Sequence, residues 1–230
     1  MRKFSSFKFS FLVVTLISFG ICFSASAFAA SKYEITDIGT LGGSNSYAQG
    51  INDFGQVVGY SNTGSGNSRA FLWGRSSGME NLGTFNDSSL HSYAYGINNS
   101  GQIVGQSYTG TSWLTAHAFL WERDSGMINL GYFCGSSNFA ASINNNEQVV
   151  GETGYPVSRQ AFLWERDSGM VDIGGLGRKS YAKGINDSGQ IVGSSGGVGF
   201  LWEDGTMLDL NDLLFEETDW IVQNAQAIEE

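Results

Sequence analysis

The chain has 230 residues, of which 22 are acidic and 12 basic, with 32 glycines and one proline. Three basic residues lie within the first ten positions, so the rest of the chain holds nine basic and 22 acidic residues, a net charge of −13. Such a charge repels phosphate backbones and anionic lipid headgroups, which argues against nucleic acid and membrane surfaces as partners. Cations, neutral glycans and basic proteins remain open.

The first element in the chain is a signal peptide over residues 1–29. Basic residues precede an apolar run at positions 11–23, and a stretch rich in small residues follows it. The run is shorter than the roughly 20 residues that cross a bilayer, and no later segment approaches that length. We expect cleavage after Ala29, or alternatively after Ala27, and a secreted product that is periplasmic or extracellular.

Cleavage leaves Cys134 as the one remaining cysteine, so no disulfide forms within the chain. Stability must then come from an apolar core, for which about 200 residues are sufficient. The thiol of Cys134 is either buried and inert or pairs between two chains.

Residues 30–230 form a single domain of repeats. The repeat is visible in SYAQGINDFGQVVGYS, SYAYGINNSGQIVGQS, NFAASINNNEQVVGET and SYAKGINDSGQIVGSS, whose isoleucines are 46, 46 and 42 residues apart. The units lie near residues 46–84, 92–131, 138–175 and 180–211, and a partial fifth unit lies at 220–230. Internal repetition at this period is typical of propellers and solenoids.

Each unit predicts four short strands, which in the first unit are residues 47–51, 56–61, 70–73 and 79–84. The first two are joined by Asn52-Asp53-Phe54-Gly55, whose side-chain acceptors and glycine favour a tight hairpin. The second is rich in β-branched valine, and the third, Ala-Phe-Leu-Trp, is apolar on both faces. Both faces of the sheet must therefore be covered.

Four strands per unit with apolar faces match the blade of a β-propeller, where neighbouring sheets cover each other. We therefore expect an all-β fold, a β-propeller-like array of four-stranded antiparallel repeats. A β-solenoid is the rival, although its coils repeat in fewer residues and pair in parallel. Large aromatic rings should fill the space between blades: Phe71, Phe119, Phe162, Phe200, Trp73, Trp121, Trp164 and Trp202.

The two ends of the repeat region leave two possibilities. Residues 224–228 repeat the first-strand pattern, and residues 35–39 align with 171–174, with Asp37 opposite Asp172. Either the two ends pair in one blade and close the ring, or the chain is shorter than its relatives and keeps open edges. Open edges, or Cys134, would allow a dimer in place of a monomer.

The consensus aromatic-Ala-x-Gly-Ile-Asn-(Asp/Asn)-x-Gly-Gln-(Val/Ile)-Val-Gly, followed by Ala-Phe-Leu-Trp and Gly-Met-x-(Asp/Asn)-Leu-Gly, resembles the bacterial HAF repeat family. His117-Ala118-Phe119 is the triplet that names the family, and Glu147 departs from the pattern by replacing the turn glycine. The resemblance covers nearly everything after Lys32. It implies an exported repeat protein and supplies no activity, because members are described as uncharacterised.

Catalytic and metal chemistry finds little support in the residues. The recurrent Asn-Asp and Asn-Asn turns offer too few oxygens for calcium, and two histidines with one thiol make no transition-metal set. We predict no cofactor. Catalytic carboxylates normally break a repeat, whereas one recurrent position holds acids or amides, which indicates a repeated structural hydrogen bond: Asp37, Asn81, Asn129, Asp172 and Asp209.

Departures from the repeat are the candidate binding residues. The loop at residues 107–116 contains Tyr108, Trp113 and Leu114, which could stack on a sugar or fold back over their own blade. Arg178 and Lys179 form a small basic cluster near Lys183. We therefore expect a non-catalytic binding or scaffold module for a glycan or an envelope protein, with a glycan hydrolase or lyase as the alternative.

Overall fold

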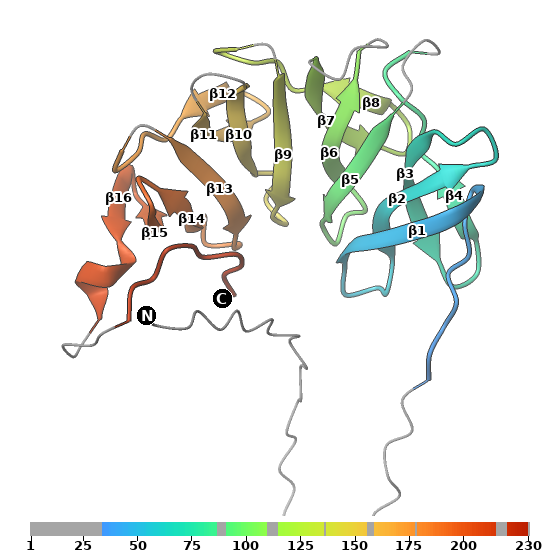
Figure 1. The fold of residues 1–230 in the computed structure, drawn as a ribbon, viewed down its shortest axis with the longest axis horizontal. Coiled ribbons are helices and arrows are strands. Elements are labelled where there is room, and N and C mark those ends of the chain that lie inside the picture. The colour runs from blue at the N-terminus through green and yellow to red at the C-terminus, as the bar shows by residue number, and fades with distance from the viewer. Residues whose placement is uncertain are drawn as a thin grey trace, which may run out of the picture. The chain divides into compact units, whose positions relative to one another are not determined.

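The computed structural model describes residues 34–86, 91–109, 115–135, 137–155, 159–177, 179–214 and 220–229. The chain divides into residues 1–36 and 37–230, and every described strand belongs to the second unit. The described residues of this unit form four separate four-stranded sheets, each with its strands in chain order and antiparallel (Figure 1). The signal peptide predicted at residues 1–29 lies outside the described residues.

The four sheets follow one another along the sequence. The first contains β1 (Gly42–Ile51), β2 (Val57–Thr63), β3 (Ser68–Gly74) and β4 (Gly78–Asn81). The second contains β5 (Ser92–Ile97), β6 (Ile103–Tyr108), β7 (Ala116–Glu122) and β8 (Gly126–Asn129). The third contains β9 (Ser137–Ile143), β10 (Val149–Tyr155), β11 (Gln160–Glu165) and β12 (Gly169–Asp172). The fourth contains β13 (Ser180–Ile185), β14 (Ile191–Ser195), β15 (Val198–Glu203) and β16 (Thr206–Asp209), followed by the 3-10 helix η1 (Leu210–Leu213).

The predicted hairpin between the first two strands of each unit is confirmed. Asn52 Oδ1 accepts hydrogen bonds from the backbone N–H groups of Phe54 and Gln56, at 3.2 and 3.0 Å. Gly55 follows at φ +70°, a conformation that costs a glycine little. In the third unit Glu147 takes the same left-handed conformation at φ 63°, so the departure from the pattern places a strained residue in this turn.

The glycine that ends each Val-Val-Gly segment is required by close contact between strands. A Cβ atom added at Gly59 would lie 1.9 Å from the carbonyl oxygen of Tyr47 on the neighbouring strand. The register between β1 and β2 shifts next to this point, between Ala48 and Gly50, which is a β-bulge. The repeat therefore keeps glycine where the bulged first strand approaches the second.

The core lies between consecutive sheets. Between the first and second sheets, Val58, Ala70, Leu72 and Leu82 of the first pack against Ala94, Ile97, Ile103, Phe119 and Trp121 of the second. The next two interfaces repeat these positions. The four predicted phenylalanines are fully buried, Trp121 and Trp164 are buried, and Trp73 and Trp202 are half-buried.

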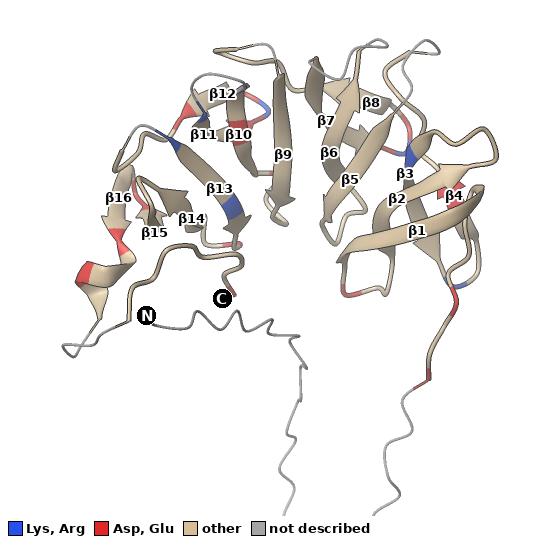
Figure 2. Ribbon diagram, viewed as in Figure 1, with Lys and Arg blue, Asp and Glu red and all other residues tan. Residues whose placement is uncertain are grey.

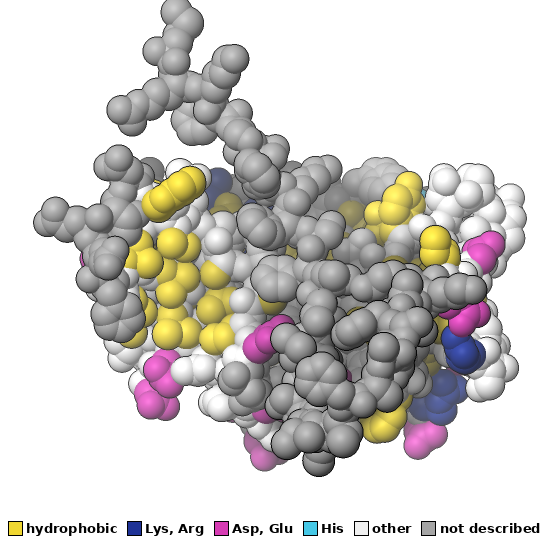
Figure 3. Space-filling model, turned by 90° about the horizontal axis from the view of Figure 1, so that it is seen from below, with side chains coloured by type: hydrophobic (Ala, Val, Ile, Leu, Met, Phe, Trp, Pro, Cys, Tyr) yellow, Lys and Arg dark blue, Asp and Glu magenta, His cyan; other side chains and the backbone are white. Residues whose placement is uncertain are grey.

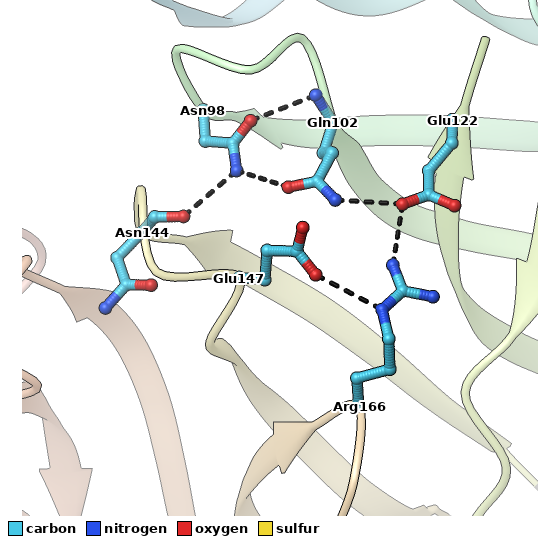
Figure 4. Close-up of polar contacts among 6 residues, drawn as sticks. All are labelled: Asn98, Gln102, Glu122, Asn144, Glu147 and Arg166. Atoms are coloured by element: carbon cyan, nitrogen blue, oxygen red, sulfur yellow. Dashed lines mark hydrogen bonds and ion pairs between the residues drawn. The ribbon is translucent and has the colours of Figure 1, made fainter.

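A row of side-chain amides joins the hairpin turns of neighbouring sheets. Asn98 Nδ2 donates to Gln102 Oε1 at 2.7 Å within its own turn and to the carbonyl oxygen of Asn144 in the next sheet at 3.1 Å (Figure 4). The same bond joins Asn52 to Asn98 at 3.1 Å and Asn144 to Asn186 at 2.9 Å. These asparagines therefore connect sheets as well as cap turns.

An ion-pair network extends this row at the second and third sheets. Gln102 Nε2 donates to Glu122 Oε1 at 2.9 Å, and Glu122 accepts from Arg166 Nη2 of the third sheet at 2.6 Å (Figure 4). Arg166 Nε also reaches Glu147 Oε2 at 3.2 Å. One guanidinium thus links the strained turn residue of the third sheet to the second sheet.

The recurrent acid or amide at the end of each fourth strand makes the predicted structural hydrogen bond, as does Asp37 before the first sheet. Asn81 Oδ1 accepts from the N–H of Gly83 at 2.9 Å, and Asp172 Oδ1 accepts from Gly174 at 2.8 Å. Asp37, Asn129 and Asp209 do the same at 2.9 Å. Because this bond turns the chain, β4 ends at Asn81 rather than at the predicted Thr84.

Residues 220–229 lie against the fourth sheet in the place where each earlier sheet receives the first strand of the next. Ala225 N donates to Gly193 O at 3.1 Å, and Asn186 Nδ2 donates to Glu229 O at 3.3 Å. A Cβ at Gly199 would lie 2.8 Å from Val222, which explains why the alanine of Ala-Phe-Leu-Trp is a glycine here. This segment forms no strand pairing, so the fifth unit is a docked segment without a sheet.

The sheets do not close into a ring, so closure by pairing of the two ends is wrong for this structure. Residues 34–40 and 220–229 contain no strand, and therefore neither end adds one to a closing blade. The all-β fold of four antiparallel four-stranded sheets is confirmed. In the described part of the chain, no helix is long and apolar enough to cross a membrane.

Candidate functional site

A cavity of about 350 Å³ opens between the second and third sheets. It is walled by residues of β5, β6 and β7 on one side and of β9, β10 and Arg159, which precedes β11, on the other, and these strands neighbour each other in Figure 1. Its described lining is Tyr95, Gln106, Tyr108, Ala116, Ser137, Asn138, Phe139, Glu152, Thr153 and Arg159. Six of these ten residues are polar or charged and three are aromatic, so the lining is more polar than that of most small-molecule sites.

Glu152 is the acidic residue in the described lining of this cavity. It lies on β10 opposite Phe139 of β9, so the two side chains share one face of the third sheet. Only 5% of Glu152 is exposed, and its Oε1 accepts a 2.5 Å hydrogen bond from Arg159 Nη1. Oε2 is buried and has no hydrogen-bond partner among the described residues. A buried oxygen of this kind normally has a partner, which is either a protein group or an ordered water.

Burial raises the pKa of the Glu152 carboxyl, and the positive charges of Arg159 and Lys183 only partly reverse this rise. Removing a carboxylate from water disfavours its charged form, which is the cause of the upward shift. The group is therefore easier to protonate than an exposed glutamate, and it can accept a hydrogen bond or, when protonated, donate one.

The aromatic wall is formed by Tyr95, Tyr108 and Phe139. The rings of Tyr95 and Phe139 meet edge to face with centroids 5.7 Å apart, and Gln106 Nε2 donates to the Tyr95 hydroxyl at 3.0 Å. Burial also raises the pKa of Tyr95, so its phenol stays protonated at physiological pH. The wall thus offers ring faces and a neutral hydroxyl beside the carboxyl of Glu152.

Two cations flank the carboxyl. Lys183 Nζ lies 5.2 Å from the centroid of the Phe139 ring and 5.8 Å from that of Tyr181, and the guanidinium of Arg159 lies 5.6 Å from the Tyr181 ring. Glu152 lies on β10 and Lys183 on β13, and Figure 2 shows an acidic position on the former strand and a basic position on the latter. A cation at such a distance from a ring centroid is attracted to the ring face.

The structure places the predicted binding residues in different locations. Tyr108 lines the cavity, whereas Trp113, Leu114 and Arg178 lie outside the described residues. Lys179 lines a separate cavity of about 740 Å³ between the fourth sheet and residues 220–229. The structure therefore brings Tyr108 to the site around Glu152, and Lys179 is not part of it.

The sequence prediction did not include Tyr95, Phe139, Glu152 or Arg159. Two of them lie at positions that differ in every repeat: Glu152 aligns with Tyr60, Gln106 and Ser194, and Tyr95 aligns with Gln49, Ala141 and Lys183. Neither residue departs from a repeated pattern, so nothing in the sequence signalled them. Only the stacking of two sheets brings Tyr95 of one repeat next to Phe139 of the next.

The histidines and the free cysteine take part in other contacts. His117 Nδ1 lies 2.9 Å from Asn129 Nδ2, His91 Nδ1 accepts from Ser68 N at 3.2 Å, and Cys134 Sγ lies 2.9 Å from Gln160 Oε1. Within the described ranges, no three His, Cys, Asp or Glu side chains are close enough to hold one metal ion. The cavity at Glu152 is therefore the site with the most distinctive chemistry.

The sequence matches no protein-family model and no curated protein. Among solved structures it is similar to the crystal structure of TolB from Acinetobacter baumannii, at 14% sequence identity and a TM-score of 0.49. That similarity covers 72% of this chain and 40% of the TolB chain, so this chain spans about two fifths of the length of that protein.

Proposed function

We propose that this chain is an exported, non-catalytic repeat protein that binds a saccharide in the cavity between the second and third sheets. The observation that supports this most directly is Glu152 Oε2, a buried carboxyl oxygen without a partner in the described wall of that cavity. A hydrogen-bond donor on a ligand would satisfy this oxygen.

A sugar ring has the matching chemistry. Its C–H face packs on aromatic rings, and its hydroxyls donate to carboxyl oxygens. Tyr95, Tyr108 and Phe139 supply ring faces, while Glu152 and Arg159 supply an acceptor and a donor that lie side by side. The strongly negative surface of the mature chain favours a neutral or cationic glycan over an acidic one.

Binding fits the site better than hydrolysis does. Most glycoside hydrolases use two carboxyl groups on either side of the bond that is cleaved. Glu152 is the one acid in the described lining of the cavity, and its Oε1 is occupied by Arg159. The alternative of a glycan hydrolase or lyase therefore lacks a second acid at this wall.

The test is binding of the purified mature protein to a panel of oligosaccharides, followed by calorimetry on those that bind. Glu152→Gln keeps the shape but removes the charge, and we expect binding at least tenfold weaker, because a hydrogen bond to a charged group contributes about 1.5–3 kcal/mol. Glu80→Gln is the matched control, since it removes a carboxylate that pairs with Arg123 at 3.3 Å away from the cavity.

A second pair of variants tests the aromatic wall. Phe139→Ala should weaken binding, whereas Tyr47→Ala, at the equivalent repeat position but 47% exposed and outside the cavity, should leave it unchanged. Trp113→Ala in the same assay tests the loop predicted from the sequence. A panel on which no saccharide binds, or binding that Glu152→Gln leaves intact, would reject the proposal.

Export is part of the same proposal and has its own test. Basic residues followed by an apolar run and small residues support a cleaved leader, as does the resemblance of the repeats to the HAF family. N-terminal sequencing of protein recovered from the periplasm and the medium should find a chain that starts at Ala30, or at Phe28 with the alternative site. Recovery with residues 1–29 intact would contradict export.

A further inference from the structure

Among the described strands, none covers one face of the first sheet. We call it the leading face and define it by Ala48, Ile51, Val57 and Trp73. Ile51 is 68% exposed, whereas the equivalent Ile97, Ile143 and Ile185 are 9%, 7% and 7% exposed. Ala48 is exposed, whereas Ala94, Ala140 and Ala182 are fully buried. The difference arises because the second, third and fourth sheets each have a preceding sheet over this face.

The three interfaces between consecutive sheets show which residues cover the equivalent of the leading face. In each, a valine, an alanine and two larger aliphatic residues of the preceding sheet pack on it. In the fourth sheet the corresponding surface, the trailing face, contains Val192, Gly199, Leu201 and Leu210. Leu201 and Leu210 are only half-buried there, whereas Leu72, Leu120 and Leu163 are 4%, 0% and 8% exposed.

We propose that the leading face of one chain docks on the trailing face of a second copy, as one sheet docks on the next within the chain. The commitment to a second copy rests on continuity with the three internal interfaces, because the uncovered leading face and the trailing face, against which residues 220–229 lie, repeat the two sides of those interfaces. The contact is head to tail, so each copy keeps one further face open.

Residues 220–229 occupy the trailing face, where Gly199 N donates to Val222 O at 2.7 Å, and they would have to leave it. They imitate a first strand with Ala227 in place of glycine and Glu229 in place of asparagine, and Ile228 is only half-buried there. Large apolar side chains next to them are exposed: Leu213 45%, Leu214 42%, Trp220 83% and Ile221 68%. Figure 3 shows hydrophobic side chains gathered at this end of the array, which is the end of the fourth sheet in Figure 1.

The acidic residues of the hairpin turns predict the affinity of the head-to-tail association. Within the chain, Asn145 Nδ2 donates to Asp187 Oδ2 at 2.8 Å and Asn99 Nδ2 donates to Asp53 Oδ2 at 2.7 Å. In the head-to-tail contact the corresponding pair is Asp187 of one copy and Asp53 of the next. Two carboxylates there lack the amide donor and repel each other, so association should be weak at neutral pH and stronger after one charge is removed.

The test is sedimentation velocity of the mature full chain over a wide concentration range. Wild type should associate in a concentration-dependent way. Asp53→Asn should tighten association about tenfold, because it restores the amide–carboxylate bond and removes a like charge. Asp124→Asn, which removes the same charge in an exposed turn of the second sheet, should change association less than about twofold. Ile51→Glu should yield monomers, and its exposed position keeps the fold intact, as circular dichroism would check.

Each alternative has a distinct result. If wild type and Asp53→Asn both stay monomeric, the leading face does not bind a second copy. If Asp53→Asn associates no more tightly than Asp124→Asn, the contact is not head to tail. Should Ile51→Glu lose its native circular dichroism, Ala48→Glu at the same face replaces it. Persistence of association in either folded variant would also overturn the proposal.

Discussion

The packing of sheet on sheet makes a quantitative prediction at two equivalent isoleucines. Ile97 and Ile51 occupy the same place in two repeats with the same neighbours on the strand, but they are 9% and 68% exposed because only Ile97 has a preceding sheet over it. Replacing a buried isoleucine by alanine costs about 2–5 kcal/mol, partly from lost transfer free energy and partly from the cavity left behind. Ile97→Ala should therefore lower the free energy of unfolding by about 3 kcal/mol.

Ile51→Ala removes side-chain atoms that are mostly in water already. About a third of the side chain is buried, so the expected loss is below about 1 kcal/mol. Urea unfolding followed by circular dichroism and tryptophan fluorescence measures both changes, at low protein concentration so that no second copy covers Ile51. Equal losses in the two variants would refute the reasoning, because they would show that cover by the neighbouring sheet does not stabilise these residues.

Three further predictions concern single residues. Trp121→Ala, at a ring 6% exposed, should cost about 3–5 kcal/mol in the same urea experiment, and an unchanged midpoint would remove the ring from the core. Glu147→Gly should relieve the left-handed turn at φ 63° and raise the free energy of unfolding by up to about 1 kcal/mol. The loss of the exposed ion pair to Arg166 would reduce this gain. A destabilised variant would show that the ion pair contributes more than the strain costs. Because the folded pKa of Glu152 is raised, its contribution to stability is fully present at low pH and falls as pH rises through that pKa. Glu152→Gln should therefore flatten the decline in stability between mildly acidic and neutral pH, and parallel profiles for the two proteins would contradict the raised pKa.

Most of the fold could be predicted from the residues of one repeat. Asn52 and Gly55 specify the hairpin, Gly59 marks the close approach of two strands, and Phe71 and Trp73 alternate with Ala70 and Leu72 so that both faces of a strand are apolar. These are local features, since each depends on backbone conformation or on neighbours within the same sheet. The hydrogen bond between Asn81 and Gly83 also spans only two residues, so the recurrence of this residue type in the sequence was sufficient to predict it.

The candidate site was harder to predict, because its residues meet only through packing between repeats. Tyr108 was identified as a departure in a loop, but Tyr95 and Glu152 lie in ordinary strand positions on two different sheets. The same is true of Asn98, whose sequence context indicates a turn cap but whose second bond reaches Asn144 in the next sheet. The residues of one repeat do not indicate which side chains of the neighbouring repeat they will contact.

The repeated pattern of the sequence is sufficient to determine the four-stranded unit, its turns and the need to cover both faces of each sheet, because side-chain periodicity and turn chemistry act over a few residues. Which faces remain uncovered, and which side chains meet around Glu152, depends on how the sheets stack. Stacking brings together residues about 40–60 positions apart, such as Tyr95 and Phe139, and these contacts exist only once whole sheets have formed.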